Sequence, residues 1–241
     1  MKRSTISILL LMCCFLFLSG FAYGGSAGVQ QTGKGYIAID AGHQKKGNSA
    51  KEPLGPGSSQ MKAKVTGGTK GVATGIPEYE LTLRVSQLLR DELTRRGYTV
   101  LMIRETNDVN LSNSERAMLA NNAGVDAFIR IHANGSSNPS VSGAMTICQT
   151  AANPYNGNLH GRSRQLSESV LNHLSAATGA KKQKIWETDT MTGINWCLTP
   201  VTIVEMGYMS NPDEDRKMAT DEYRLKLATG IANGIDEFMG K

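Results

Sequence analysis

The feature that most constrains this chain is a set of short apolar runs that each lead into a histidine or a glutamate. The runs at residues 36–39, 128–131 and 201–204 are followed by His43, His132 and Glu205. Runs of this kind predict buried strands of a parallel sheet. In open α/β sheets, ligands bind just beyond the carboxyl ends of such strands. We therefore expect two imidazoles and a carboxylate to meet at one edge of a single sheet.

Helical patterns separate these runs. Residues 77–96 place Leu81, Val85 and Leu89 on one apolar face, and a glycine follows the last turn. Similar patterns predict helices over residues 115–123, 163–178 and 222–239, and strands over residues 98–103, 142–149 and 181–186. Strands that alternate with helices are typical of an α/β fold. Residues 44–75 show no apolar periodicity, and we expect them to form a long surface loop.

The first residues have the pattern of an export signal. Two basic residues precede an apolar segment that is short for a bilayer span, and small residues follow it. We interpret residues 1–24 as a signal peptide, with a retained membrane anchor as the alternative. Residues 25–34 read as a flexible linker, and residues 35–241 are long enough for one domain with a sizeable core. The domain is expected outside the cytoplasmic membrane, in the extracellular or periplasmic space.

Charge and cysteine content restrict the partners. The formal net charge of +5 includes Lys2 and Arg3 of the signal, and the remaining basic balance suits an anionic surface such as a cell wall. No basic run with interleaved aromatic residues indicates nucleic acid. Cys148 and Cys197 lie outside the signal. An exported protein allows a disulfide between them, and two separate buried thiols are the alternative.

The histidines and glutamates fit a metal-dependent hydrolase. Catalytic zinc usually takes three ligands from histidine and carboxylate and keeps a fourth position for water. His43 and His132 supply two ligands, and Glu78 is placed for the third because the helix that returns from the first strand begins beside the same sheet edge. Glu80 points to a different face. Glu205 is then free for acid–base chemistry.

Each of these residues also has a structural interpretation. A histidine at a strand end often only satisfies local hydrogen bonds, and Glu78 alone would complement a helix dipole. Glu205 alone would be an ion-pair partner for an arginine. Asp40 is either a ligand or a residue that holds the turn at Gly42. Only the combination of these residues favours a metal site.

Four motifs give the chain a resemblance to a known family. They are Ile39-Asp40-Ala41-Gly42-His43, residues 77–83, Ile131-His132-Ala133-Asn134 and residues 204–211. In this order they resemble the zinc-dependent N-acetylmuramoyl-L-alanine amidases of the amidase-3 type, over nearly all of residues 35–239. The resemblance implies an α/β fold with a central, mostly parallel but mixed sheet of about six strands, flanked by helices.

The resemblance also implies an activity and a site. It implies Zn²⁺ held by His43, Glu78 and His132, with Glu205 as the catalytic carboxylate. The substrate would be peptidoglycan, cleaved at the amide between N-acetylmuramic acid and L-alanine of the stem peptide. Residues 35–241 would form the amidase catalytic domain.

The chain departs from the family at two places. Residues 44–48 replace a glycine-rich stretch after the first histidine, and no extra amphipathic segment lies between His132 and Glu205. We therefore predict no built-in helix that blocks the site. Loops at residues 134–140 and 187–195 are the expected substrate surface, and Asn134 either orients His132 or holds substrate. Targeting depends on the catalytic domain, on a partner such as an activating protein, or on a membrane anchor.

Three other functions fit parts of the pattern. A different zinc hydrolase, such as a peptidase, would share the fold and metal. A wall-binding protein without catalysis would not require an unpaired carboxylate at Glu205. A structural zinc domain would be closed and rich in cysteine, whereas this constellation contains none.

Overall fold

The computed structural model describes residues 33–241, so the expected signal or anchor and most of the expected linker lie outside the described residues. The strands are β1 (Tyr36–Ala41), β2 (Asn48–Pro53), β3 (Met61–Val65), β4 (Thr99–Met102), β5 (Ala127–Asn134), β6 (Ala144–Cys148), β7 (Lys182–Glu187) and β8 (Val201–Tyr208). The helices are α1 (Glu78–Arg95), α2 (Asn113–Ala123), α3 (His160–Thr178), α4 (Thr192–Asn195), α5 (Pro212–Met218) and α6 (Asp221–Phe238), and a short 3-10 helix covers Gly157–Leu159.

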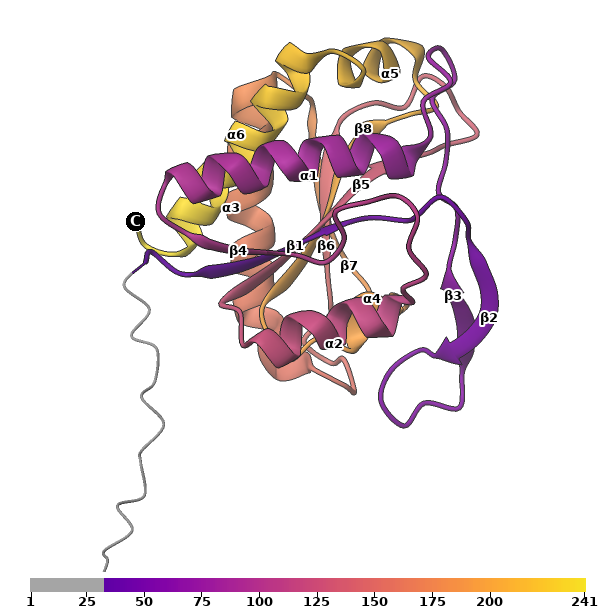
Figure 1. Ribbon diagram of the computed structural model, residues 1–241, viewed down its shortest axis with the longest axis vertical. Helices are drawn as coiled ribbons and strands as arrows, with labels where there is room; N and C mark the ends of the chain where they lie inside the picture. The colour runs from indigo at the N-terminus through magenta and orange to yellow at the C-terminus, as the bar shows by residue number, and fades with distance from the viewer. Residues whose placement is uncertain (1–32) are drawn as a thin grey trace, which may run out of the picture. The chain divides into compact units, whose positions relative to one another are not determined.

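Six strands form the central sheet in the order β4-β1-β5-β8-β6-β7, and β2 pairs with β3 in a separate hairpin. The strands β4, β1, β5 and β8 run parallel, while β6 is antiparallel to β8 and parallel to β7. Helices cover both faces of the sheet (Figure 1). The expected α/β fold with a mostly parallel, mixed sheet of six strands is thus confirmed.

Alternation along the strands divides the core into two layers. On β5, Ile129 and Ile131 face the layer under α1, α3 and α6, whereas Phe128 faces the layer under α2 and α4. This period of two follows from the pleat of a strand. His132, two residues after Arg130, therefore points to the same side as α2. Burial of both faces explains why the strands read as continuous apolar runs.

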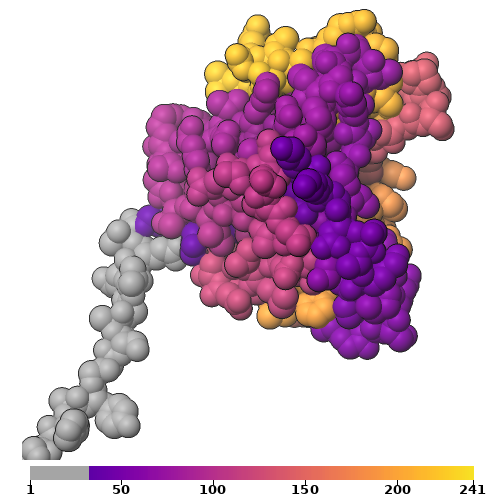
Figure 2. Space-filling model, turned by 45° about the vertical axis from the view of Figure 1, so that its right-hand side comes forward, coloured from indigo at the N-terminus to yellow at the C-terminus, as the bar shows by residue number. Residues whose placement is uncertain are grey.

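Two expected loops contain regular structure. Residues 44–75 include the hairpin β2–β3, so the prediction of an irregular loop is wrong there. The hairpin has polar strands, and hydrogen bonds hold it against α2. Ser114 of α2 donates its N–H and its hydroxyl to the buried Glu52 at 3.1 and 2.6 Å. Figure 2 shows the hairpin, in dark purple, beside the magenta residues of α2. The expected loop before β8 likewise contains the single turn α4.

Smaller features agree with the sequence. Ser112 caps α2 in a capping box with Glu115, as the pattern predicts. Cys148 and Cys197 are free, buried thiols, so of the two alternatives the structure has no disulfide between them. Among the described residues no helix has the length and apolarity to cross a bilayer.

Candidate metal centre

The structure brings the three expected ligands together at the carboxyl end of the parallel strands. His43 follows β1, Glu78 begins α1 and His132 lies near the end of β5. Glu78 Oε1 lies 3.1 Å from His43 Nε2 and 3.2 Å from His132 Nδ1, and the two nitrogens are 3.1 Å apart. The rings meet edge to face with centroids 4.7 Å apart. All three donor atoms therefore converge on one point.

The donor set fits a divalent metal ion. Tetrahedral ligands at about 2.0–2.1 Å from zinc lie roughly 3.3 Å from one another, close to the three separations in this cluster. Burial lowers the pKa of His132, which keeps its imidazole neutral and able to bind metal. For Glu78, burial acts to raise the pKa, but the hydrogen bonds from His132 and His43 outweigh it and hold the pKa well below its usual range. The site thus offers two imidazole nitrogens and one carboxylate.

Hydrogen bonds from neighbouring residues orient the three expected ligands. His43 Nδ1 lies 3.0 Å from the Thr66 carbonyl, which directs Nε2 toward the cluster. Glu78 accepts backbone N–H groups from Thr69 and Ala133 at 2.8 and 3.1 Å. Thr66 directly follows β3, so the hairpin that the sequence did not predict helps to position the first ligand.

Glycines leave room for the ligands. A Cβ at Gly42 would overlap the ring of His132, and a Cβ at Gly68, where φ is +78°, would lie 2.9 Å from Glu78 Oε2 and from the His43 ring. His43 itself has φ of 62°, the only positive value among non-glycine residues 33–241. A left-handed residue with a side chain costs about 1–2 kcal/mol, so the surrounding contacts must hold this turn.

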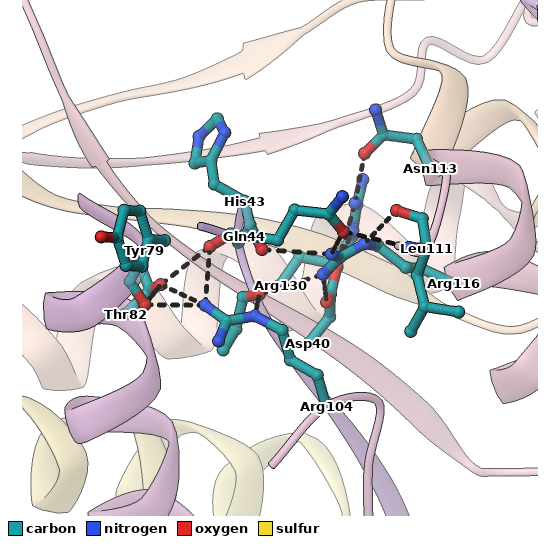
Figure 3. A network of polar contacts seen from close by, with 12 residues as sticks. Asp40, His43, Gln44, Tyr79, Thr82, Arg104, Leu111, Asn113, Arg116 and Arg130 are labelled. Carbon is teal, nitrogen blue, oxygen red and sulfur yellow. Dashed lines mark hydrogen bonds and ion pairs between the residues drawn. The ribbon is translucent and has the colours of Figure 1, made fainter. Parts of the chain in front are cut away.

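Buried arginines hold the turn that carries His43. Arg104 Nε donates to the Ala41 carbonyl at 2.7 Å, and Arg116 Nη2 donates to the His43 carbonyl at 3.1 Å. Figure 3 shows these arginines beside Asp40, which accepts from Arg116 at 2.7 Å and from Arg130 at 3.0 Å. Asp40 therefore does not join the ligands; it anchors Arg116, which holds the turn, and Arg130.

Glu205 faces the same cavity as the ligands. Register pairs it with His132 across β5 and β8. Its Oε2 is enclosed and has no hydrogen-bond partner among residues 33–241. Burial, with the nearby Glu78 charge, raises the pKa of Glu205 to about 8. The structural alternative of an arginine partner for Glu205 does not occur in the described part of the chain.

The cavity beside the cluster has a volume of about 300 Å³. Its wall includes residues 190–193, which belong to one of the two expected substrate loops, and Ile147 and Ile203. Lys62 of the hairpin closes one side, because its Nζ donates to the Thr190 carbonyl at 2.8 Å. The other expected loop does not line this cavity, and the Asn134 side chain contacts Gly135 and Met145 instead of His132.

Comparison with known proteins agrees with this geometry. A family model described as N-acetylmuramoyl-L-alanine amidase matches residues 37–237. An uncharacterized protein of Bacillus subtilis, YqiI, is 29% identical over 167 residues, which cover 69% of this chain and 77% of that one. The N-acetylmuramoyl-L-alanine amidase Rv3717 of Mycobacterium tuberculosis is 28% identical over 186 residues, with coverage of 72% and 76%.

A solved structure is similar over most of the fold. The N-acetylmuramyl-L-alanine amidase Ami1 from Mycobacterium smegmatis superposes with a TM-score of 0.76 at 27% identity, covering 85% of this chain and 96% of that one. The fold and site define an α/β hydrolase with a candidate metal site. The chain belongs to the Amidase_3 family of N-acetylmuramoyl-L-alanine amidases, and it is a hydrolase that acts on peptidoglycan.

Proposed function

We propose that this protein is a zinc-dependent amidase that cleaves the bond between the lactyl group of N-acetylmuramic acid and L-alanine. The observation that carries the proposal is that two of the three converging donor residues, His43 and His132, line one cavity together with the unpaired carboxylate of Glu205. His43, Glu78 and His132 would hold the metal. Two histidines and a carboxylate are a ligand set that catalytic zinc takes in hydrolases.

Glu205 supplies the proton transfer in this proposal. Zinc, when bound, polarises the substrate carbonyl and lowers the pKa of water. Glu205, in its ionised form, takes a proton from the attacking water and then returns it to the departing amine of L-alanine. Glu205 lines the cavity and forms no ion pair within residues 33–241, so its carboxylate is available to take the proton. The apolar floor at Ile147 and Ile203 favours a small side chain such as that of alanine.

The proposal includes export. Residues 1–24 would direct the domain across the membrane, and the cell wall would be its site of action, with or without a retained anchor. The CwlD amidase from Clostridioides difficile has been solved in complex with the GerS lipoprotein. That structure is 18% identical and shows the fold alone, so an activator for this protein stays a prediction without a named partner.

The test is product analysis together with metal content. Purified residues 25–241 are expected to hold about one zinc per chain and to release L-alanine amino groups from peptidoglycan while leaving muramic acid intact. Glu78→Gln should lose zinc and activity. Glu80→Gln is the matched control, because Glu80 lies two residues further along α1 and pairs only with Arg84 at the surface. A protein that carries metal and releases no amino groups would contradict the proposal.

A further inference from the structure

One cation in the cavity has no part in the proposed reaction. Arg130 lies on β5 two residues before His132, and both side chains face the cavity. Residues i and i+2 of a strand are about 7 Å apart. The Arg130 side chain is only 4% exposed, so a full positive charge lies within the wall of the substrate cavity.

Two of the three nitrogens of the Arg130 guanidinium donate hydrogen bonds to side chains, and the third does not. Arg130 Nε donates to Asp40 Oδ2 at 3.0 Å, and Nη2 donates to Asn113 Oδ1 at 2.9 Å. Nη1 has no hydrogen-bond partner among residues 33–241, and Arg130 is one of the residues that line the cavity. Figure 3 shows Arg130 held between Asp40 and Asn113.

This nitrogen packs directly on a glycine at the cavity wall. A Cβ at Gly193 would overlap Arg130 Nη1, and Gly193 also lines the cavity. Two partners thus fix the plane of the guanidinium, and its third corner, which rests against Gly193, has no hydrogen-bond partner in the described part of the chain. A fixed guanidinium with a free N–H is suited to a carboxylate.

We propose that Arg130 Nη1 binds the free carboxylate of the stem-peptide residue that follows L-alanine, so that the enzyme prefers acidic over amidated stem peptides. This inference rests on the proposed amidase function. One extended residue spans at most about 3.6 Å, so a carboxylate on the second residue lies roughly 6–7 Å from the amide nitrogen that is cleaved. Arg130 and His132 line the same cavity, so we assign that carboxylate to Arg130.

The test compares two substrates that differ only in this group. N-acetylmuramoyl-L-alanyl-D-glutamate and its α-amide, the D-isoglutamine compound, are cleaved by the zinc-loaded enzyme. We expect kcat/KM to be roughly tenfold or more higher for the acid, the factor that a charge-assisted hydrogen bond supplies. Arg130→Gln should bring the two values within about twofold of each other by slowing the acid. Equal rates in the wild type, or an unchanged ratio in Arg130→Gln, would overturn the inference.

Two further variants distinguish the effect of Arg130 from that of the other residues around the cavity. Lys62→Met removes one positive charge from the same cavity and is expected to keep the preference for the acid; loss of the preference there would assign it to the general field instead of to Arg130. Gly193→Ala keeps the arginine but presses a methyl group on its guanidinium, closest to Nη1. It should reduce the ratio severalfold, and it replaces Arg130→Gln if that variant does not fold.

Binding gives a readout without catalysis. Calorimetry of chelator-treated protein with L-alanyl-D-glutamate and with L-alanyl-D-isoglutamine should show about tenfold tighter binding of the acid, lost in Arg130→Gln. Selective binding without any cleavage of peptidoglycan would support the inference and contradict the amidase function. Cleavage without selectivity would leave the function standing and overturn only the role of Arg130.

Discussion

Two carboxylates near the same edge of the sheet, the fully buried Asp40 and the half-buried Glu205, behave in opposite ways. Asp40 on β1 accepts from Arg116 and Arg130. Burial acts to raise its pKa, but the two guanidinium groups outweigh that effect and lower the pKa to about 2. Glu205 on β8 has an enclosed oxygen without a partner, and burial raises its pKa to about 8. The decisive difference is the supply of hydrogen-bond donors: Asp40 has two guanidinium groups, and Glu205 Oε2 has no donor among residues 33–241.

This difference gives the two carboxylates different roles: Asp40 stabilises the fold, and Glu205 is available for the reaction. Helix α2 delivers Arg116 to Asp40, and the resulting cluster holds the turn at His43 through backbone carbonyls. No described element delivers a cation to Glu205. An unpaired buried carboxylate is costly for stability, and such costs are typical of functional sites. The following predictions test the contrast, from the largest expected effect to the smallest.

Glu205→Gln should abolish most of the hydrolytic activity and leave the fold intact. General acid–base groups contribute roughly 10²- to 10⁴-fold to rate, so we expect kcat to fall by that factor while zinc content is unchanged. The free energy of unfolding should not decrease, because the variant removes a buried charge that lacks a partner. Peptidoglycan cleavage, metal analysis and denaturant unfolding check these points. Glu237→Gln, on the exposed surface, is the control with the same chemical change.

Asp40→Asn should have the reverse effect of Glu205→Gln: it should mainly lower the free energy of unfolding. Removing one partner of a buried ion pair costs about 3–5 kcal/mol, and here two arginines lose their carboxylate. Urea unfolding measures the difference. Asp213→Asn is the matched control, because that carboxylate is 85% exposed and pairs with Arg216 at the surface; it should change stability by less than about 0.5 kcal/mol. Equal effects of the two variants would contradict the role given to Asp40.

The same two carboxylates should give pH dependences of opposite sign. The pKa of Asp40 falls from 3.8 to about 2 on folding, so its contribution is present above pH 3.8 and is lost as pH falls toward 2, by about 2 kcal/mol. The pKa of Glu205 rises from 4.5 to about 8, so its cost grows from pH 4.5 to 8. In chelator-treated protein, the stability difference between wild type and Asp40→Asn should shrink below pH 3.8. The advantage of Glu205→Gln should increase from pH 4.5 to 8, and a constant difference would contradict the assignment.

Gly68→Ala should weaken metal binding although it replaces none of the three expected metal ligands. Its Cβ would lie 2.9 Å from Glu78 and His43, and φ is positive there. Contacts around metal ligands are worth about 10- to 100-fold in affinity, so we expect zinc affinity to fall at least tenfold in a competition assay. Gly67→Ala is the neighbouring control, because nothing lies within 4 Å of its Cβ. If both variants bind zinc as the wild type does, the packing argument is wrong.

Much of the fold could be predicted because it depends on local patterns. The period of 3.6 in α1 and the capping box at Ser112 are contained in short segments. The hairpin could not be predicted, because its polar strands are held by Glu52 and Lys62, whose partners lie 62 and 128 residues away in the chain. Arg130 offered a signal that was missed: on a strand, a residue two positions before His132 lies on the same face.

The sequence by itself determined the alternation of strands and helices and the residue types that end each strand, because these follow from periodicity and from short motifs. Tertiary structure alone decided which buried carboxylate is paired. Asp40 and Arg116 are separated by 76 residues, and register sets Glu205 beside His132. Whether a buried charge has a partner depends on contacts between distant segments, and these form only when the sheet and its helices pack together.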